Sequence, residues 1–371
     1  MNNQAQSAER TPLEDRLIDL IKTQGPITVA DYMADALGHP HEGYYMTRAA
    51  IGAEGDFITA PEISQIFGEL IGLWLVEAWR GMGSPTRFNL VELGPGRGVL
   101  MADLLRAARL RPDFTRGAQV WLLETSGRLR LEQQKRLKTS EIKPIWADSL
   151  SDIAPAPSLI IANEFFDCLP IHQFQFHDGT WRERMVGLRE DERGLAFELS
   201  KESVEIDAGA ASAAPSEGDI VEVSYAAQDF MADLSTALLD HGGHALIFDY
   251  GHRASGLGET FQAVRSHQFW PPLAAPGYAD LTAHVDFESL AHAAIGHGAA
   301  VQGPIAQGRF LERLGLALRV EMLCKGKPEE QAETIRSGAH RIAAPEEMGE
   351  IFKTLCVSAP GLPTPPGFEW L

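Results

Sequence analysis

The stretch FNLVELGPGRGVL, residues 88–100, decides the fold of this chain of 371 residues. Its first half, Phe88–Leu93, is a short apolar run that predicts a buried strand and leads directly into three closely spaced glycines. A helix is expected from Val99 onward. Glycines permit a sharp turn and a close approach of the backbone to a ligand, and the start of the helix offers free N–H groups. The stretch therefore predicts the strand, turn and helix of a ligand-binding α/β fold.

The pattern of strand and helix continues on the C-terminal side of this stretch. Short apolar runs that predict further strands alternate with segments of helical periodicity. Such alternation is typical of a parallel sheet with helices on both faces. The further strands are expected at 119–124, 143–146, 158–163, 244–250 and in AAVQG at 299–303.

Two regions depart from the alternation. Residues 1–85 predict a helical cover, with helices from Thr11 to Gly25, from Thr28 to about Leu37, and from Pro61 onward. Residues 171–223 contain β-rich pieces and the low-complexity segment DAGAASAAPSEGD, which predicts an inserted hairpin region with a loop. We therefore expect a cover over residues 1–85 and a main domain over 86–371, with an insertion at about 171–223.

The composition excludes several classes of protein. The formal net charge of −19 argues against a nucleic-acid binder and against docking on anionic lipid, since both need a basic face. The apolar windows are too short to span a bilayer. Three cysteines without CxxC spacing do not indicate a disulfide framework or a zinc site, and His39 and His41 lack further ligands at suitable spacing. No metal is therefore expected.

The glycine turn is compatible with more than one ligand. A phosphate-binding GxxxxGK[ST] loop is absent, and the dinucleotide pattern GxGxxG fails because Val99 stands where its third glycine should be. S-adenosylmethionine (SAM) carries an ammonium and a sulfonium, so an acid at the strand end, Glu92, suits it. The alternative is a tight turn that binds no ligand.

Two further acids follow the next strands. Glu124 ends the second strand, where a carboxylate accepts hydrogen bonds from ribose hydroxyls. Asp148 follows the third strand and is placed to reach an adenine amino group. The alternative for Asp148 is a turn or helix-capping acid.

The loop after the fourth strand, NEFFDCLP at residues 163–170, carries a second group of polar residues. Asn163, Glu164 and Asp167 emerge at the carboxyl end of the sheet, where ligands of α/β folds bind. A pair of carboxylates suits a cationic acceptor such as arginine, because it can orient the guanidinium and localise its charge. The alternative for Glu164 and Asp167 is that they cap the next turn. Glu62, at the start of a predicted helix, is another candidate for a catalytic acid, and its alternative is a favourable partner of the helix dipole.

These motifs together resemble the MidA-like family of SAM-dependent methyltransferases. The resemblance covers most of the chain and includes GYY (43–45), GDFITAPEISQIFGE (55–69), ELGPGRG (92–98), NEFFDCLP, DYGH (249–252) and DLTAHVDF (280–287). It implies a Rossmann-like seven-stranded methyltransferase sheet with an N-terminal helical cover and an inserted β-rich region. The expected cofactor residues are Glu92, Gly94, Pro95, Gly96, Gly98, Glu124, Asp148 and Asn163, and the expected catalytic residues are Glu164, Asp167 and Glu62.

The resemblance also implies an activity, a cofactor and a partner. Mitochondrial members of this family assist assembly of respiratory complex I by methylating an arginine of a core subunit. We therefore expect SAM as cofactor, and a protein substrate with an exposed arginine. The alternatives are an assembly factor or chaperone with little or no catalysis, a small-molecule methyltransferase and, more distantly, an NAD oxidoreductase. The acidic N-terminal stretch does not resemble a transit peptide, so a bacterial cytoplasmic protein is expected.

Overall fold

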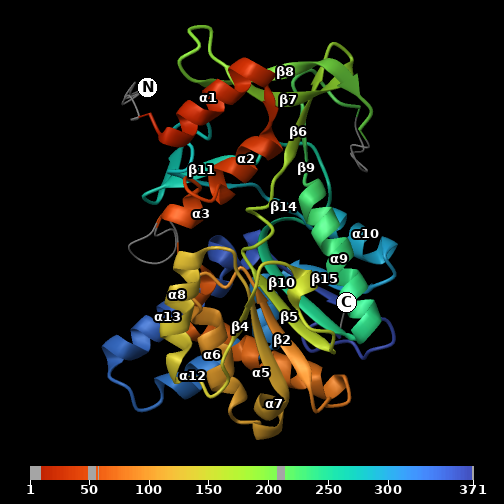
Figure 1. Ribbon diagram of the computed structural model, residues 1–371. Coiled ribbons are helices and arrows are strands. Elements are labelled where there is room, and N and C mark those ends of the chain that lie inside the picture. The colour runs from red at the N-terminus through yellow and green to blue at the C-terminus, as the bar shows by residue number, and fades with distance from the viewer. Residues whose placement is uncertain (1–9, 49–55, 57, 207–213, 370–371) are drawn as a thin grey trace. The chain divides into compact units, whose positions relative to one another are not determined.

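The computed structural model describes residues 10–48, 56, 58–206 and 214–369 (Figure 1). The chain forms two compact units, each built from three separate segments. Unit 1 contains Met1–Phe57, Asp167–Ala227 and Ala254–His284; unit 2 contains Ile58–Phe166, Gln228–Arg253 and Val285–Leu371. This division falls elsewhere than the boundary expected at residue 85, because the helix that precedes residue 85 packs within unit 2.

Unit 2 is built on the sheet that the sequence predicts. The strand order β15-β16-β10-β5-β2-β3-β4 contains seven strands, and the two-residue β14 pairs with β10 as an eighth. The strands are β2 (Phe88–Leu93), β3 (Ala118–Leu123), β4 (Ile145–Ala147), β5 (Ser158–Asn163), β10 (Gly243–His252), β14 (Val285–Asp286), β15 (Ala300–Ala306) and β16 (Phe352–Ser358). The bounds of five of these strands agree with the predicted positions to within two residues. These strands are β2, β3, β4, β5 and β10.

The sheet is mixed, although the alternation of strands and helices indicated a parallel sheet. Strands β4, β3, β2, β5 and β10 run parallel to one another, but β16 lies antiparallel between β10 and β15. The chain order reverses between β2 and β5, which are neighbours in the sheet although β3 and β4 separate them in sequence. In open α/β sheets ligands bind at such a reversal, beyond the carboxyl ends of the strands.

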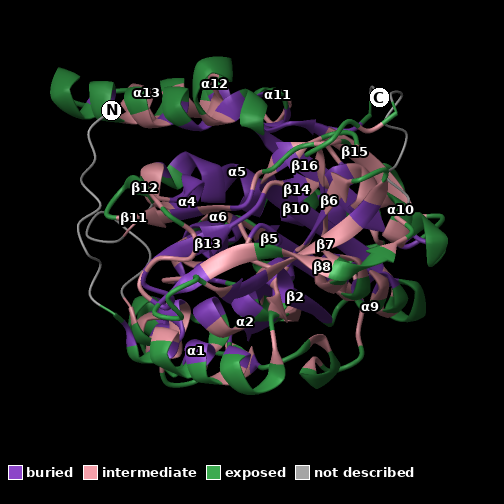
Figure 2. Ribbon diagram, turned by 90° about the horizontal axis from the view of Figure 1, so that it is seen from above, coloured by how far each residue is buried: buried purple, intermediate pink, exposed green. Residues whose placement is uncertain are grey.

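Helices cover the sheet and bury its apolar side chains. Figure 2 shows mostly buried residues on α5 and α6, and mainly exposed and intermediate residues on α12 and α13. The helices of unit 2, including most of α9, are α4 (Ala60–Ile63), α5 (Gln65–Gly81), α6 (Val99–Ala108), α7 (Pro112–Gly117), α8 (Gly127–Arg136), α9 (Tyr225–His241), α10 (Phe287–Gly296), α11 (Gln307–Arg313), α12 (Leu316–Cys324) and α13 (Glu329–Ala343).

Helix α5 packs unusually close to α6. A Cβ atom added at Gly68 would lie 2.6 Å from Cβ of Asp103, and one added at Gly72 would lie 2.6 Å from the carbonyl oxygen of Leu104. The carboxylate of Glu69, which is 4% exposed, lies between the guanidinium groups of Arg106 and Arg319 and links α5 to α6 and α12. The end of the GDFITAPEISQIFGE motif therefore serves the packing of unit 2.

The single helix expected from Pro61 is two helices. Helix α4 ends at Ile63, and α5 begins at Gln65. Ser64 between them has extended backbone, and its hydroxyl accepts a hydrogen bond from the backbone N–H of Ile66. Serine is a preferred N-cap residue, so it starts a new helix here instead of continuing the first.

Unit 1 contains the predicted β-rich insertion. Four of its strands form one antiparallel sheet with the short β1, and three others form a second sheet. Its elements are α1 (Pro12–Gln24), β1 (Ile27–Thr28), α2 (Val29–Gly38), α3 (Tyr44–Thr47), β6 (His172–His177), β7 (Thr180–Leu188), β8 (Leu195–Val204), β9 (Ile220–Val223), β11 (Gln262–Arg265), β12 (Gln268–Trp270) and β13 (Asp280–Thr282). Part of the predicted low-complexity loop, residues 207–213, lies outside the described residues.

Candidate active site

The glycine turn after β2 requires glycine at three positions. Gly94, Gly96 and Gly98 have φ angles of 57°, 49° and 74°, in the left-handed region that side chains with a Cβ rarely adopt. A Cβ atom at Gly94 would also lie 3.0 Å from Cδ2 of Phe165. The glycine turn and the loop after β5 therefore lie against each other, as the strand order predicts. Pro95 completes the turn, since its carbonyl oxygen accepts a hydrogen bond from Gly98 N–H at 2.7 Å.

Glu92 is a buried acid directly before this turn. The residue is only 3% exposed, and its Oε2 atom is buried without a hydrogen-bond partner among the described residues. Burial raises the pKa of Glu92 to about 8, with a further rise from the nearby Glu124 and an opposing contribution from a hydrogen bond with the Met101 backbone. A buried carboxyl with an unused oxygen fits a cationic group of a ligand.

Hydrogen bonds from several residues hold the carboxylate of Glu124, which directly follows β3. Ser126 N–H donates to its Oε1 at 2.8 Å, and Gln133 Nε2 donates to its Oε2 at 3.1 Å. Burial raises the pKa of Glu124, and these bonds oppose the rise. A carboxylate has about four acceptor positions, so Glu124 retains capacity for ribose hydroxyls.

Asp148 follows β4 as predicted, but it is largely exposed. Its Oδ1 accepts a hydrogen bond from Arg130 Nη2 at 2.7 Å, and Arg130 Nε donates to the main-chain oxygen of Glu124. The ion pair therefore connects the ends of β3 and β4. The role of Asp148 toward an adenine ring stays a prediction.

The loop after β5 holds Glu164 in an unusual backbone conformation. Its φ angle is 50°, which is costly for a residue with a side chain and recurs at functional sites. Its Oε1 accepts hydrogen bonds from Asn163 Nδ2 at 3.0 Å and from Ala60 N–H at 3.4 Å. Helix α4, which contains Ala60, thus meets the loop after β5. Asn163 Oδ1 is buried without a hydrogen-bond partner among the described residues, so it too is available to a ligand.

Asp249 fixes this loop from the neighbouring strand β10. Its Oδ2 accepts hydrogen bonds from the N–H groups of Phe165 at 3.2 Å and of Phe166 at 3.0 Å. Asp249 lies in the DYGH motif but was not among the residues predicted for the site. The sequence feature that could have indicated Asp249 is its position near the carboxyl end of the strand predicted at 244–250, which pairs with β5.

Glu62 lies beside the glycine turn. Its Oε2 is 3.5 Å from Arg97 Nη1, and its side chain is 14% exposed. The structure thus brings the TAPEIS segment to the turn that follows β2. An ion pair with Arg97 is therefore a further candidate role for Glu62. The other two candidate roles are a favourable partner of the helix dipole and a catalytic acid.

Asp167 belongs to unit 1, whereas Glu164 belongs to unit 2. Asp167 is buried, and its main-chain oxygen accepts a hydrogen bond from Ala283 N–H. Burial, and next the charge of Asp167, raise the pKa of Asp280 well above its usual value; Tyr45 donates a hydrogen bond to Asp280 at 2.7 Å. Asp167 therefore lies in an acidic surrounding built from three segments of unit 1.

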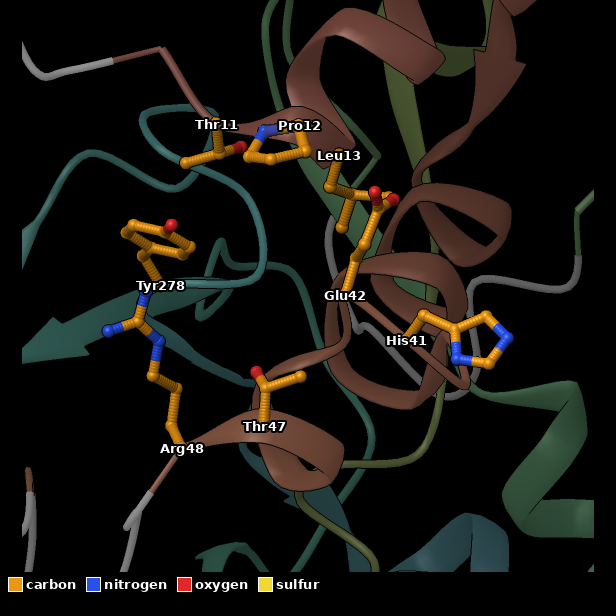
Figure 3. Close-up of a pocket in the computed structure, with 8 residues that line it drawn as sticks. All are labelled: Thr11, Pro12, Leu13, His41, Glu42, Thr47, Arg48 and Tyr278. Atoms are coloured by element: carbon orange, nitrogen blue, oxygen red, sulfur yellow. The ribbon is translucent and has the colours of Figure 1, made fainter.

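A separate pocket of about 290 Å³ lies in unit 1 (Figure 3). The guanidinium of Arg48 lies 3.6 Å from the ring centre of Tyr278, and Figure 3 shows Glu42 on the other side of the cavity. The pocket contains none of the residues predicted for the cofactor or for catalysis. Its lining residues are Thr11, Pro12, Leu13, His41, Glu42, Thr47, Arg48 and Tyr278.

The fold and the site together define a class of protein. A seven-stranded sheet of this order, with a glycine turn after its first strand and an acid after its second, is that of a Rossmann-like SAM-dependent methyltransferase. A family model described as "Putative S-adenosyl-L-methionine-dependent methyltransferase" matches residues 70–305. The chain belongs to this family.

Relatives of known name agree with this class. The chain is 37% identical to the human "Protein arginine methyltransferase NDUFAF7, mitochondrial", over 92% of this chain and 82% of the relative. It is 38% identical to the Drosophila melanogaster homolog of that protein, over 91% of this chain and 82% of the relative. Among solved structures, a "likely methyl transferase" from Burkholderia thailandensis bound to S-adenosyl-homocysteine superposes with a TM-score of 0.81 at 25% identity, covering 96% of this chain and 93% of that one.

The residues present fit SAM as the cofactor. The unused Glu92 oxygen suits a cationic group, the glycine turn admits a ligand close to the backbone, and Glu124 has acceptor capacity for a ribose. In the part of the chain that the structure describes, no helix is both long and apolar enough to cross a membrane.

Proposed function

We propose that this protein transfers a methyl group from SAM to an arginine side chain of a protein substrate, and that the substrate is a core subunit of respiratory complex I or a related protein. The observation that carries the proposal is Glu164, a carboxylate whose backbone is left-handed and whose Oε1 accepts a hydrogen bond from Ala60 N–H of α4, next to Phe165, which lies against the glycine turn. The printed names of the curated relatives support arginine as the acceptor.

The chemistry of the acceptor explains why a carboxylate belongs here. SAM supplies an electrophilic methyl group when it is bound. A guanidinium arrives protonated and has no free lone pair in the direction of attack until its charge is localised on the other nitrogens. Glu164 and Glu62, which both belong to unit 2, pair with the guanidinium, orient one nitrogen and hold the positive charge on the remaining two, whereas a catalytic role of Asp167 stays a prediction. Positioning of this kind supplies much of the rate acceleration in a displacement reaction.

The charge of the chain supports a basic partner. A net charge of −19 attracts a positively charged segment of a substrate. Salt screens this attraction, so its range becomes shorter as ionic strength rises. Capture of the substrate is therefore expected to slow as ionic strength rises. A bacterial cytoplasmic location remains part of the proposal.

The test is to incubate the protein with labelled SAM and bacterial lysate and to locate the modified residue by mass spectrometry. A methylated arginine in one polypeptide, lost in Glu164→Gln, is the expected result. Label on a metabolite pool with none on polypeptides would replace the proposal with a small-molecule methyltransferase. Subunit assembly that persists in a Gly96→Val variant unable to bind SAM would replace it with a non-catalytic assembly factor.

A further inference from the structure

A side-chain amide in α8 connects the parts of the cofactor site. Gln133 is completely buried. Its Nε2 donates to the main-chain oxygen of Gly96 at 2.7 Å and to Oε2 of Glu124 at 3.1 Å, and its Oε1 accepts from Nε1 of Trp146 at 2.7 Å. The three partners lie in or directly after three strands that are neighbours in the sheet, β2, β3 and β4.

Only one orientation of the amide satisfies all three partners. The indole N–H of Trp146 can only donate, whereas the carbonyl of Gly96 and the carboxylate of Glu124 can only accept. An amide turned by 180° would face two acceptors with its oxygen and a donor with its NH₂ group. Trp146 therefore fixes the direction in which Gln133 points its two hydrogens.

The backbone of α8 also lies close to the glycine turn. A Cβ atom at Gly98 would be 3.4 Å from Cα and Cγ of Gln133. One helical turn further along, Arg136 Nε donates to the main-chain oxygen of Arg97 at 3.0 Å. Side chains of α8 thus bind the successive carbonyl oxygens of Gly96 and Arg97. Of these two side chains, Gln133 also donates a hydrogen bond to Glu124.

We propose that Gln133 is a positioning residue of the cofactor site, which holds the Glu124 carboxylate in the orientation and charge state that bind the ribose and holds the glycine turn beside it. The proposal rests on the cofactor part of the proposed function and is independent of the methyl acceptor. Its physical basis is that a buried carboxylate keeps its charge only with hydrogen-bond donors, and Gln133 is one of the donors that Glu124 has. Hydrogen bonds to charged groups contribute more than those between neutral groups.

The test measures the affinity for S-adenosyl-homocysteine by calorimetry, so that it does not depend on methyl transfer. Gln133→Leu removes all three hydrogen bonds and preserves most of the volume, and is expected to weaken binding by about 10- to 100-fold. Gln134→Leu is the matched control, since Gln134 is the exposed neighbour on the same helix, and it should leave the affinity within twofold of that of the wild-type protein.

A double-mutant cycle separates positioning from general stability. If Gln133 acts through Glu124, Gln133→Leu in a Glu124→Gln background should weaken binding by less than about threefold. In the single variant, the loss should also shrink as pH rises, because a higher pH restores the charge of Glu124 without the amide. A purely structural role would give the same loss in both backgrounds and at every pH, and would overturn the proposal.

Trp146→Phe gives a second variant, which keeps an aromatic ring but loses the pyrrole ring of the indole together with its N–H. It is expected to weaken binding by about two- to tenfold, again with little effect in the Glu124→Gln background. Binding unchanged in this variant, or in folded Gln133→Leu protein, would refute the proposal. Failure of the wild-type protein to bind S-adenosyl-homocysteine would overturn the cofactor assignment and this proposal together, whereas absence of arginine methylation would affect only the proposed acceptor.

Discussion

Replacing Glu92 by glutamine should stabilise the cofactor-free protein, and the gain should grow with pH. The pKa of Glu92 rises from 4.5 to about 8 on burial. A carboxyl whose pKa is raised in the folded state binds its proton more tightly there than in the unfolded chain. The wild-type protein therefore loses stability as pH increases from 4.5 toward 8, and Glu92→Gln, which cannot ionise, avoids that loss.

The size of the effect follows from the two pKa values. Each pKa unit corresponds to about 1.36 kcal/mol, so the full shift of Glu92 corresponds to about 5 kcal/mol above pH 8. Between about pH 5.5 and about pH 8, the difference in the free energy of unfolding between variant and wild type should change by about 3 kcal/mol. Any constant cost of burying the amide cancels from this difference.

The assay is urea unfolding of both proteins at the two pH values, with Glu141→Gln as an exposed control that should show no such change. A parallel measurement follows SAM affinity, because a cationic ligand favours ionised Glu92. The affinity of the wild-type protein should rise by up to about tenfold per pH unit between about pH 6 and about pH 7.5, and the rise should vanish in Glu92→Gln. A stability difference that stays within about 0.5 kcal/mol across the pH range would show that Glu92 ionises normally, and the argument for a cationic ligand at its oxygen would fail.

Three further changes test other parts of the structure. Glu69→Gln removes the buried carboxylate that two partly exposed arginines share and should lower the free energy of unfolding by about 1 to 3 kcal/mol; a loss below about 0.5 kcal/mol in urea unfolding would contradict a role of these ion pairs in joining α5 to α6 and α12. Gly72→Ala places a Cβ against the backbone of α6 and should cost about 1 to 3 kcal/mol, whereas Gly127→Ala, which meets nothing within 4 Å, should be close to neutral or stabilising; equal melting temperatures of the two variants would refute the close packing. Asp249→Ala releases two N–H groups of the Glu164 loop and should lower the rate of methyl transfer by more than about tenfold while S-adenosyl-homocysteine affinity changes little, with Asp249→Asn retaining part of the rate; equal losses of rate and affinity would contradict a role confined to that loop.

The sequence was most informative where local chemistry determines the structure. The apolar run of β2 and the positive φ angles at Gly94, Gly96 and Gly98 follow from residue type, so both the strand and the turn could be predicted. Glu92 and Glu124 could be placed because strand ends of a parallel sheet meet at one edge. Five strands, β2, β3, β4, β5 and β10, lie within two residues of their predicted positions, whereas the number of seven strands was implied by the resemblance to the methyltransferase family and is confirmed by the sheet order.

What the sequence did not predict depends on contacts between distant residues. Nothing near Gln133 in the chain marks it, because its importance comes from partners in three other segments. Asp249 bonds a loop more than eighty residues earlier in the chain. The direction of β16 depends on pairing with β10 and β15 and not on its own residues.

The three-segment construction of unit 1 also affects how the protein is made on the ribosome. The N-terminal helices bury Leu13 and Leu17 in a core that includes Phe261 and Leu281, which belong to the third segment. At ordinary rates of translation, about 10 to 50 s pass between synthesis of the first segment and completion of the third. During that time the apolar face of α1 lacks the part of its native covering that the third segment provides, so the nascent chain is expected to expose apolar surface until that segment emerges.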